Sequence, residues 1–250
     1  MRQDIKLGPL MRTMADGACW ISQDDYPAGQ AWTDEGERIL SHLQIHGRLE
    51  KALPNLRADK RHRDAAMAEA RIAYWFTRNG FKITEWEPKV TNQPGDLEVR
   101  WQQTTPIFAE IKHPTWESEL SEEERDAGRK DQPQHINAET RSFDTDGSLE
   151  YSVRKSLGKF SPDRPNLVVV SANLFVMPTD GTDHDSILYW LKKAEFAIVG
   201  AILVLDPILY AGKAQIEYKT IYVENPRAHG KPWQLPAEVT EGFLLANNSK

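Results

Sequence analysis

Apolar residues spaced three and four positions apart predict two helices in the first third of the chain. The first is expected to begin at Thr33, whose hydroxyl suits an N-cap, and to run to about Leu53, with Pro54 ending it. The second is expected over 59–79, where alanines are frequent, and Gly80 gives it a typical C-terminal stop.

After residue 80 the apolar period changes to two, which is typical of strands. Three short strands are expected over 81–86, 97–101 and 107–112. A helix over 149–160 and a continuous apolar run over 167–172, typical of a buried strand, follow. A further helix and two further strands are expected over 185–194, 198–205 and 216–223. The order helix, three-strand meander, helix, strand is an α/β plan in which the second helix can cross over to a parallel strand.

These patterns divide the chain into three parts. Residues 1–55 are expected to form an N-terminal extension with one helix, because 1–30 carry Gly, Pro and Asp without a clear period. Residues 56–224 would form the core, interrupted by an acidic insertion over 113–148. Residues 225–250, rich in Pro, Gly and Asn, are expected to be a tail.

Charge changes the picture only locally. The chain of 250 residues has a formal net charge of −6, which argues against a protein that coats nucleic acid without specificity. However, residues 48–82 hold nine Lys and Arg against four Asp and Glu, whereas residues 117–131 hold three against seven. A basic stretch beside a site is what phosphate recognition needs, although a solvated helix face explains it equally well.

The single cysteine, Cys19, cannot form an internal disulfide, which is compatible with a reducing cytoplasm. No secretory leader is visible, and the most apolar segments are too short or too interrupted to cross a bilayer. We therefore expect a cytoplasmic protein without a membrane association.

The candidate chemistry lies where two predicted strands meet. Asp96 opens the second strand, and Glu110 and Lys112 end the third, two positions apart and so on one face. Ile111 points to the other face, and its backbone carbonyl is expected to look toward the site. Charges that end an apolar strand are costly unless they are paired or bind a metal.

These residue types suit the hydrolysis of a phosphodiester. Asp96 and Glu110 offer the hard oxygen ligands that Mg²⁺ prefers. A bound cation polarises the phosphoryl group and helps to generate hydroxide. Lys112 can position the attacking water or stabilise developing charge. The alternative is a purely structural role, in which Glu110 and Lys112 form a salt bridge on a half-exposed sheet.

A helix with Glu69, then Gly95-Asp96, then Glu110-Ile111-Lys112 on a strand resembles the PD-(D/E)xK phosphodiesterase family, also called the restriction-endonuclease-like fold. The inserted Gly95 departs from a strict Pro-Asp. The resemblance covers roughly 59–172. It implies a restriction-endonuclease-like αβββαβ core with a mixed central sheet, here with an N-terminal helical extension and additional C-terminal strands.

The resemblance also implies a set of site residues. The catalytic group would be Asp96, Glu110, Lys112 and Glu69, and a Mg²⁺ ion, for which Mn²⁺ can substitute, would be held by Asp96, Glu110, Glu69 and the Ile111 carbonyl. A polar residue on the helix after the Glu-x-Lys strand often faces the site in this family. Lys155 is the best match for it, with Lys159 one turn on, and His113 could touch a phosphate. The alternative for Glu69 is a solvated helix position.

The preferred function is a metal-dependent nuclease, with DNA favoured over RNA, as an endonuclease of defence, repair or mobile-element type. The alternatives are a non-catalytic nuclease-like module that binds nucleic acid or protein, and an assembly subunit that contacts a partner through its acidic segment. Many enzymes of the family act as dimers, so a homodimer stays open. His42 and His46 have the spacing of zinc ligands on a helix, but we expect two exposed histidines.

Overall fold

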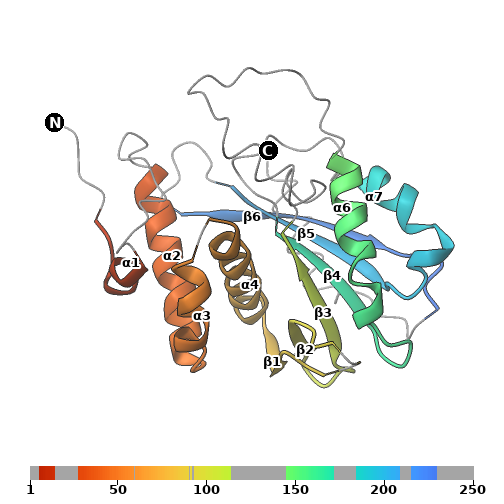
Figure 1. The fold of residues 1–250 in the computed structure, drawn as a ribbon, viewed down its shortest axis with the longest axis horizontal. Helices are drawn as coiled ribbons and strands as arrows, with labels where there is room; N and C mark the ends of the chain where they lie inside the picture. The colour runs from red at the N-terminus through yellow and green to blue at the C-terminus, as the bar shows by residue number, and fades with distance from the viewer. Residues whose placement is uncertain are drawn as a thin grey trace, which may run out of the picture.

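A computed structural model describes residues 6–14, 28–58, 60–89, 91, 93–113, 145–171, 184–208 and 215–229 (Figure 1). Its centre is a six-stranded sheet in the order β1-β2-β3-β4-β5-β6. The strands are β1 (Phe81–Trp86), β2 (Leu97–Trp101), β3 (Ile107–Lys112), β4 (Asn166–Ser171), β5 (Ala201–Ile208) and β6 (Glu217–Glu224). The α-helices are α1 (Pro9–Met14), α2 (Ala28–Ile45), α3 (Leu49–Leu56), α4 (Lys60–Arg78), α6 (Thr145–Arg154) and α7 (His184–Leu191).

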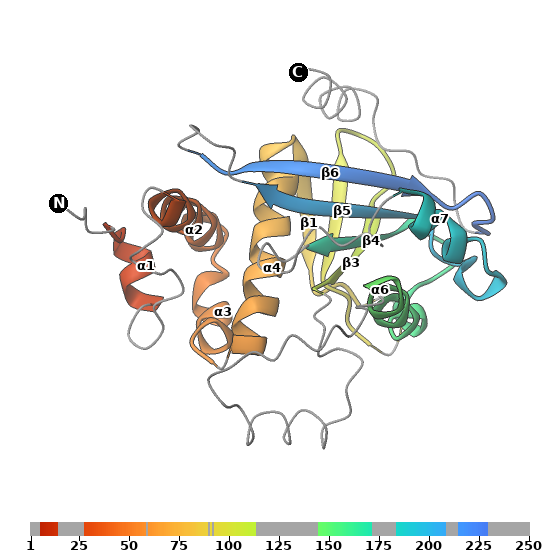
Figure 2. The same ribbon diagram turned by 90° about the horizontal axis from the view of Figure 1, so that it is seen from above.

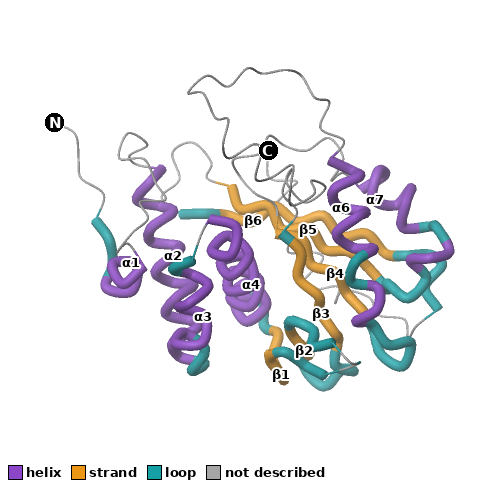
Figure 3. Tube along the Cα trace, in the orientation of Figure 1, coloured by secondary structure: helices purple, strands orange, loops and turns teal. Residues whose placement is uncertain are grey.

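The sheet is mixed, as the sequence predicts. Strands β1, β2 and β3 are antiparallel neighbours, β4 is parallel to β3 and to β5, and β6 returns antiparallel to β5. The parallel β3–β4 step is the crossover that α6 makes (Figure 3). From α4 to β4 the described elements follow the order αβββαβ, with β5 and β6 as the additional C-terminal strands.

Helices cover both faces of this sheet. On one face α4 packs Ile72, Trp75 and Phe76 against alternate strand residues such as Ile111 and Val169. On the other face α6 and α7 pack their apolar residues against strand residues that include Phe108, Val168 and Val170. Because both faces of β4 are covered, every residue of this strand is buried, which explains its continuous apolar run.

The N-terminal helices form a third layer. They pack beside α4 (Figure 2), and α2 also reaches the sheet, where Glu35 accepts a hydrogen bond from the Tyr218 hydroxyl of β6. Their core joins Met11 of α1, Leu40 of α2 and Leu56 of α3 to Met67 and Ala70 of α4. Helix α4 is therefore apolar on two sides, one for the sheet and one for the extension.

The expectation of one helix in this extension is wrong, because the described residues contain three. Thr33 lies inside α2 rather than at its start, where its buried hydroxyl donates to the Gly29 and Gln30 carbonyls. Helix α2 ends at Ile45, and Gly47, two residues later, has φ +65°. The Gly47 N–H bonds to the Gln44 carbonyl, and the Arg48 N–H bonds to the Leu43 carbonyl. This pair of bonds is the Schellman motif, and it divides what the sequence presents as one helix.

Pro54 does not end a helix before it but lies within α3. It removes one backbone hydrogen bond there, and the helix ends two residues later, at Leu56.

The second half of the chain also differs in its boundaries. The helix predicted over 149–160 ends at Arg154 and is followed by a 3-10 turn, η3 (Leu157–Lys159). Asn225 is not the beginning of a loose tail, because it is buried and its side-chain amide donates to the Phe196 and Val199 carbonyls. The predicted acidic insertion lies, apart from its two ends, outside the described residues.

Candidate functional site

Strand pairing brings Asp96 and Glu110 to the same place. The β2–β3 ladder pairs Leu97 with Ala109 and Val99 with Ile107. In this antiparallel register the next position pairs Asp96 with Glu110, at the point where the ladder ends. The two acids are therefore neighbours because of the meander itself, and the thirteen residues between them form the hairpin that joins them.

The glycine before Asp96 is required by packing. A Cβ atom at Gly95 would lie 2.1 Å from Cε2 of Phe108. Phe108 is fully buried and makes an edge contact with the Phe160 ring, at 5.7 Å between centroids. The inserted glycine of the Pro-Gly-Asp sequence thus lets the Asp96 backbone approach the core.

Glu110 is the charged centre of the site. Its side chain is fully buried, with 0 % exposed. Its Oε1 atom accepts hydrogen bonds from Lys112 Nζ at 2.7 Å and from Lys159 Nζ at 2.6 Å. Its Oε2 atom is buried and has no hydrogen-bond partner among the described residues. A buried carboxylate needs hydrogen bonds from cationic or polar groups to offset its lost hydration, and only Oε1 of Glu110 receives them from the described residues.

Asp96 is held by the backbone of the facing strand. Its Oδ2 atom accepts a hydrogen bond of 2.6 Å from the Ile111 N–H. Burial and the neighbouring charge of Glu110 raise the pKa of Asp96 to about 6, although the bond from Ile111 and the charges of Lys159 and Lys112 oppose the shift. The raised pKa reflects the cost of placing a second buried carboxylate beside Glu110.

Glu69 reaches the same site from α4. Desolvation by the surrounding protein, followed by the charges of Asp96 and Glu110, raises the pKa of Glu69 to about 7. The side chain is nevertheless exposed to solvent, so desolvation is limited and the two neighbouring carboxylates are the firmer cause. The structure thus places Asp96, Glu110 and Lys112 together, and the exposed Glu69 lies near enough for its charge to interact with those of Asp96 and Glu110.

These pKa values predict how stability depends on pH in the absence of metal. An acid whose pKa is higher in the folded than in the unfolded protein stabilises the fold when protonated, and this contribution is lost as pH rises through the folded pKa. We expect the contribution of Asp96 and Glu69 to the free energy of unfolding to decline between about pH 4 and pH 8. Urea unfolding in EDTA at several pH values measures it. The double variant Asp96→Asn, Glu69→Gln should show a shallower decline, and an unchanged slope would contradict the assignment.

Of the two lysines predicted after the Glu-x-Lys strand, the structure places Lys159 at the site. Its burial opposes its charge, but the hydrogen bond and charge of Glu110, with Asp96 and Glu69, raise the pKa of Lys159. Lys155 is exposed, and its Nζ lies 4.3 Å from the centroid of the Tyr151 ring. The helix ends before both lysines, which changes the directions that their side chains take.

The end of β4 adds two contacts that the sequence did not reveal. His113 Nδ1 lies 3.1 Å from the Ser171 carbonyl oxygen, and Arg71 Nη1 donates to Ser171 Oγ at 3.3 Å. Arg71 and Ser171 are a hundred residues apart, so only the fold could bring them together. These contacts join the end of β4 to α4 through Arg71 and to the end of β3 through His113.

The prediction of two exposed histidines at helical spacing is wrong for one of them, because only His46 is exposed. His42 is buried, with its Nε2 3.0 Å from Thr77 Oγ1 and its ring 4.4 Å from that of His46. Burial, followed by the charge of His46, lowers the pKa of His42 to about 4. His42 is therefore a neutral contact between α2 and α4.

A divalent cation fits the carboxylates of the site only as a partial shell. In the described part of the chain, no group of three or more His, Cys, Asp and Glu side chains is arranged to hold a metal ion. Asp96 and Glu110 still form a pair of hard oxygen donors, and the buried Glu110 Oε2 lacks a partner there. Mg²⁺ needs few carboxylates, since it keeps several waters. Ligation by the Ile111 carbonyl stays a prediction.

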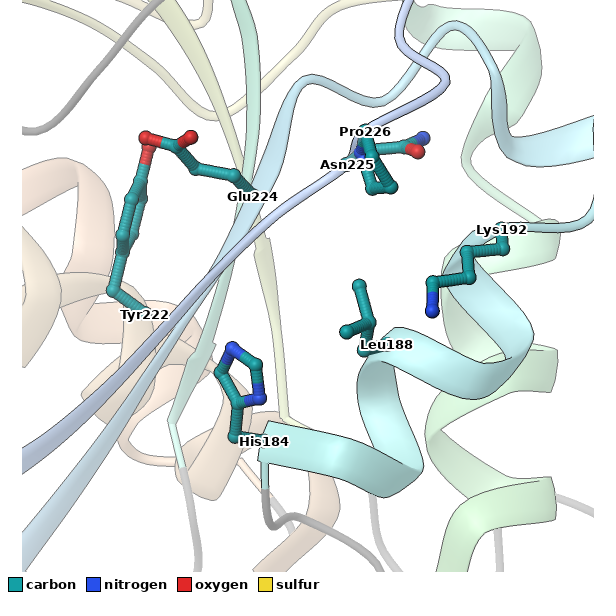
Figure 4. Close-up of a pocket in the computed structure, with 7 residues that line it drawn as sticks. All are labelled: His184, Leu188, Lys192, Tyr222, Glu224, Asn225 and Pro226. Atoms are coloured by element: carbon teal, nitrogen blue, oxygen red, sulfur yellow. The ribbon is translucent and has the colours of Figure 1, made fainter.

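A separate hollow of about 650 Å³ shares no residue with this site (Figure 4). It is lined by residues of α7 and the turn after it, and of β6 and the turn after it: His184, Leu188, Lys192, Tyr222, Glu224, Asn225 and Pro226. The hollow is wide open, and its charged groups are exposed ones.

No protein-family model and no curated protein matches the chain. Among solved structures, SfsA of Pyrococcus furiosus in complex with Ca²⁺ matches with a TM-score of 0.29 and 18 % sequence identity. The match covers 64 % of this chain and 62 % of SfsA, so the chain spans less than two thirds of the length of that protein. A likeness at this level supports no inference about activity.

One further property concerns membranes. Within the described segments, no helix has the length and apolar character needed to cross a bilayer.

Proposed function

We propose that the protein is a divalent-metal-dependent nuclease of the PD-(D/E)xK type, with DNA as its favoured substrate. The observation that carries the proposal is the convergence of Asp96, Glu110 and Lys112 at the open end of the β2–β3 ladder. The αβββαβ order of the surrounding elements and the nearby Glu69 support it. Structural ion-pair clusters seldom leave a buried carboxylate oxygen without a partner, as Glu110 does within the described part of the chain.

Each side chain has a defined task in this proposal. A Mg²⁺ or Mn²⁺ ion held by Asp96 and Glu110 would supply charge stabilisation at the phosphoryl group. Lys112 orients the attacking water and stabilises the developing charge. The water oxygen forms a bond to phosphorus while the bond to the leaving oxygen breaks, the leaving oxygen takes up a proton from solvent, and Glu69 accepts the proton from the attacking water. The charges of Asp96 and Glu110 raise the pKa of Glu69, which suits it to accept a proton nearer neutral pH than an ordinary glutamate.

A cleavage assay tests the proposal. Wild type and Glu110→Ala are incubated with plasmid, linear duplex, single-stranded DNA and RNA, each with Mg²⁺, Mn²⁺ or EDTA. We expect cutting of DNA that needs a metal ion and is lost in the variant. Circular plasmid that is nicked or linearised would show endonuclease action. Cutting in EDTA, or equal cutting by the variant, would contradict the proposal.

A second function is favoured by one specific observation. Both lysines bond to Glu110 Oε1, and no three-ligand metal group is present among the described residues. This arrangement also suits a nuclease-like module that binds nucleic acid without cutting it. Fluorescence anisotropy with labelled duplex distinguishes the two. Binding with no cutting by either metal ion would support the module.

A further inference from the structure

Two ammonium groups share one carboxylate oxygen in the site. Lys112 Nζ and Lys159 Nζ lie 2.7 Å and 2.6 Å from Glu110 Oε1. Like charges so close to one another repel, and the arrangement persists because Glu110 is fully buried and two further acids, Asp96 and Glu69, lie nearby. Three carboxylates face two lysines, so one more positive charge neutralises the cluster when all three acids are ionised.

A divalent cation changes this balance. It would add two positive charges at Glu110, where only one is needed for neutrality. Three cationic centres around one carboxylate repel strongly in a partly buried site. A divalent cation at Glu110 would therefore weaken the hold of Glu110 on its two ammonium groups.

The two lysines differ in how firmly they are held. Lys112 is part of β3 and pairs with Val170 of β4, so its backbone is fixed by the sheet. Lys159 ends the 3-10 turn η3, which begins without a side-chain cap at Ser156 and contains Gly158, around which there is open space. The two side chains are similarly exposed, 23 % for Lys159 and 19 % for Lys112, so the difference between them lies in the backbone that carries each one.

We propose that Lys159 is an internal counter-cation, which occupies the place of the metal charge in the metal-free protein and leaves Glu110 when a divalent cation binds. This inference rests on the proposed metal-dependent function and adds a regulation of that site. The displaced ammonium group stays tethered at the rim of the site. A phosphate of the substrate is its natural next partner, because an ammonium group binds phosphate oxygens as a point charge.

Isothermal titration with Mn²⁺ in the absence of substrate tests the inference. Lys159→Met removes the charge and keeps most of the volume, so we expect it to bind Mn²⁺ about tenfold more tightly than wild type. Lys155→Met is the matched control, because it removes an equal charge from the same segment but one that lies over Tyr151. The control should bind Mn²⁺ as wild type does.

Thermal unfolding gives a second readout that does not depend on activity. In EDTA we expect Lys159→Met to unfold at a lower temperature than wild type, because Glu110 loses one of its two partners. Saturating Mn²⁺ should raise the unfolding temperature of the variant more than that of wild type. If Lys159→Met does not fold, Lys159→Gln replaces it: its amide can still donate to Glu110, so a smaller fall in unfolding temperature is expected, whereas Mn²⁺ binding should again be tighter than in wild type.

The outcomes separate this inference from the proposed nuclease. Equal or weaker Mn²⁺ binding by Lys159→Met than by wild type would overturn the inference, whatever the protein cuts. Tighter binding by the variant, with no cutting of any nucleic acid, would support the counter-cation and overturn the nuclease. No Mn²⁺ binding by either protein would overturn both.

Discussion

Asp96→Asn and Lys112→Met are expected to lose metal-dependent cleavage by about a thousandfold or more while the protein stays folded. Asparagine keeps an oxygen that can accept the 2.6 Å hydrogen bond from the Ile111 N–H, but it removes the charge that would bind a cation. Alanine at this position would leave that backbone N–H without its acceptor, so asparagine separates chemistry from folding more cleanly.

The stability of these two variants is expected to differ in sign. Burial and Glu110 disfavour the Asp96 charge, so Asp96→Asn should raise the free energy of unfolding in EDTA at pH 8 by about 1 kcal/mol. Lys112→Met removes one partner of a buried carboxylate, although Glu110 keeps its bond to Lys159, so a small loss is expected.

Glu98→Gln is the matched control for both variants. Glu98 lies two positions after Asp96, in β2, and pairs with Arg164 at 3.0 Å outside the site. Cleavage rates with saturating Mg²⁺ and urea unfolding of the three variants give the comparison. If Asp96→Asn and Lys112→Met both unfold and Glu98→Gln does not, the cluster is a structural ion pair and the proposed chemistry is wrong. If Asp96→Asn and Lys112→Met fold and still cut nucleic acid, the catalytic site does not include these residues.

The elements at the centre of this fold could be predicted from the sequence because the patterns that indicate them are local. The change from a helical period to alternation after Gly80 marks where α4 ends and β1 begins, and Gly80 indeed has φ +84°. Asp96, Glu110 and Lys112 were found because a meander fixes their relation. Once β2 and β3 pair, no distant part of the chain is needed to bring them together.

Other features depended on packing that no local pattern reports. His42 is buried because α4 supplies Thr77 and Tyr74 beside it, and nothing in the α2 sequence announces this. Lys159 reaches Glu110 because the chain leaves the helix at Arg154 and forms η3. A helix drawn through to residue 160 gives the wrong directions to both lysines of that segment. Gly47 was the one missed signal that the sequence did contain.

Gly95→Ala is expected to lower the free energy of unfolding by about 2 to 3 kcal/mol. The added Cβ would lie 2.1 Å from Cε2 and 2.2 Å from Cζ of Phe108, far inside contact distance. The Phe108 ring is fully buried and packs edge-on against Phe160, so it cannot turn aside at small cost. Gly158→Ala is the control, because a Cβ there meets no atom within 4 Å.

A double-mutant cycle identifies the clash as the cause. Phe108→Leu creates space where the ring was, so Gly95→Ala should cost less in that background than in wild type, with a coupling of about 1 kcal/mol or more. Purely additive effects in urea unfolding would mean that the backbone of Gly95, and not the Phe108 ring, limits this position.

Because Asp96 is the next residue, a clash that moves the Gly95 backbone also displaces the carboxylate from Glu110. Gly95→Ala should therefore weaken Mn²⁺ binding in the fraction that stays folded, and Phe108→Leu should restore part of that binding together with the stability. Recovery of both properties in the double variant would show that packing beneath the hairpin sets the position of Asp96.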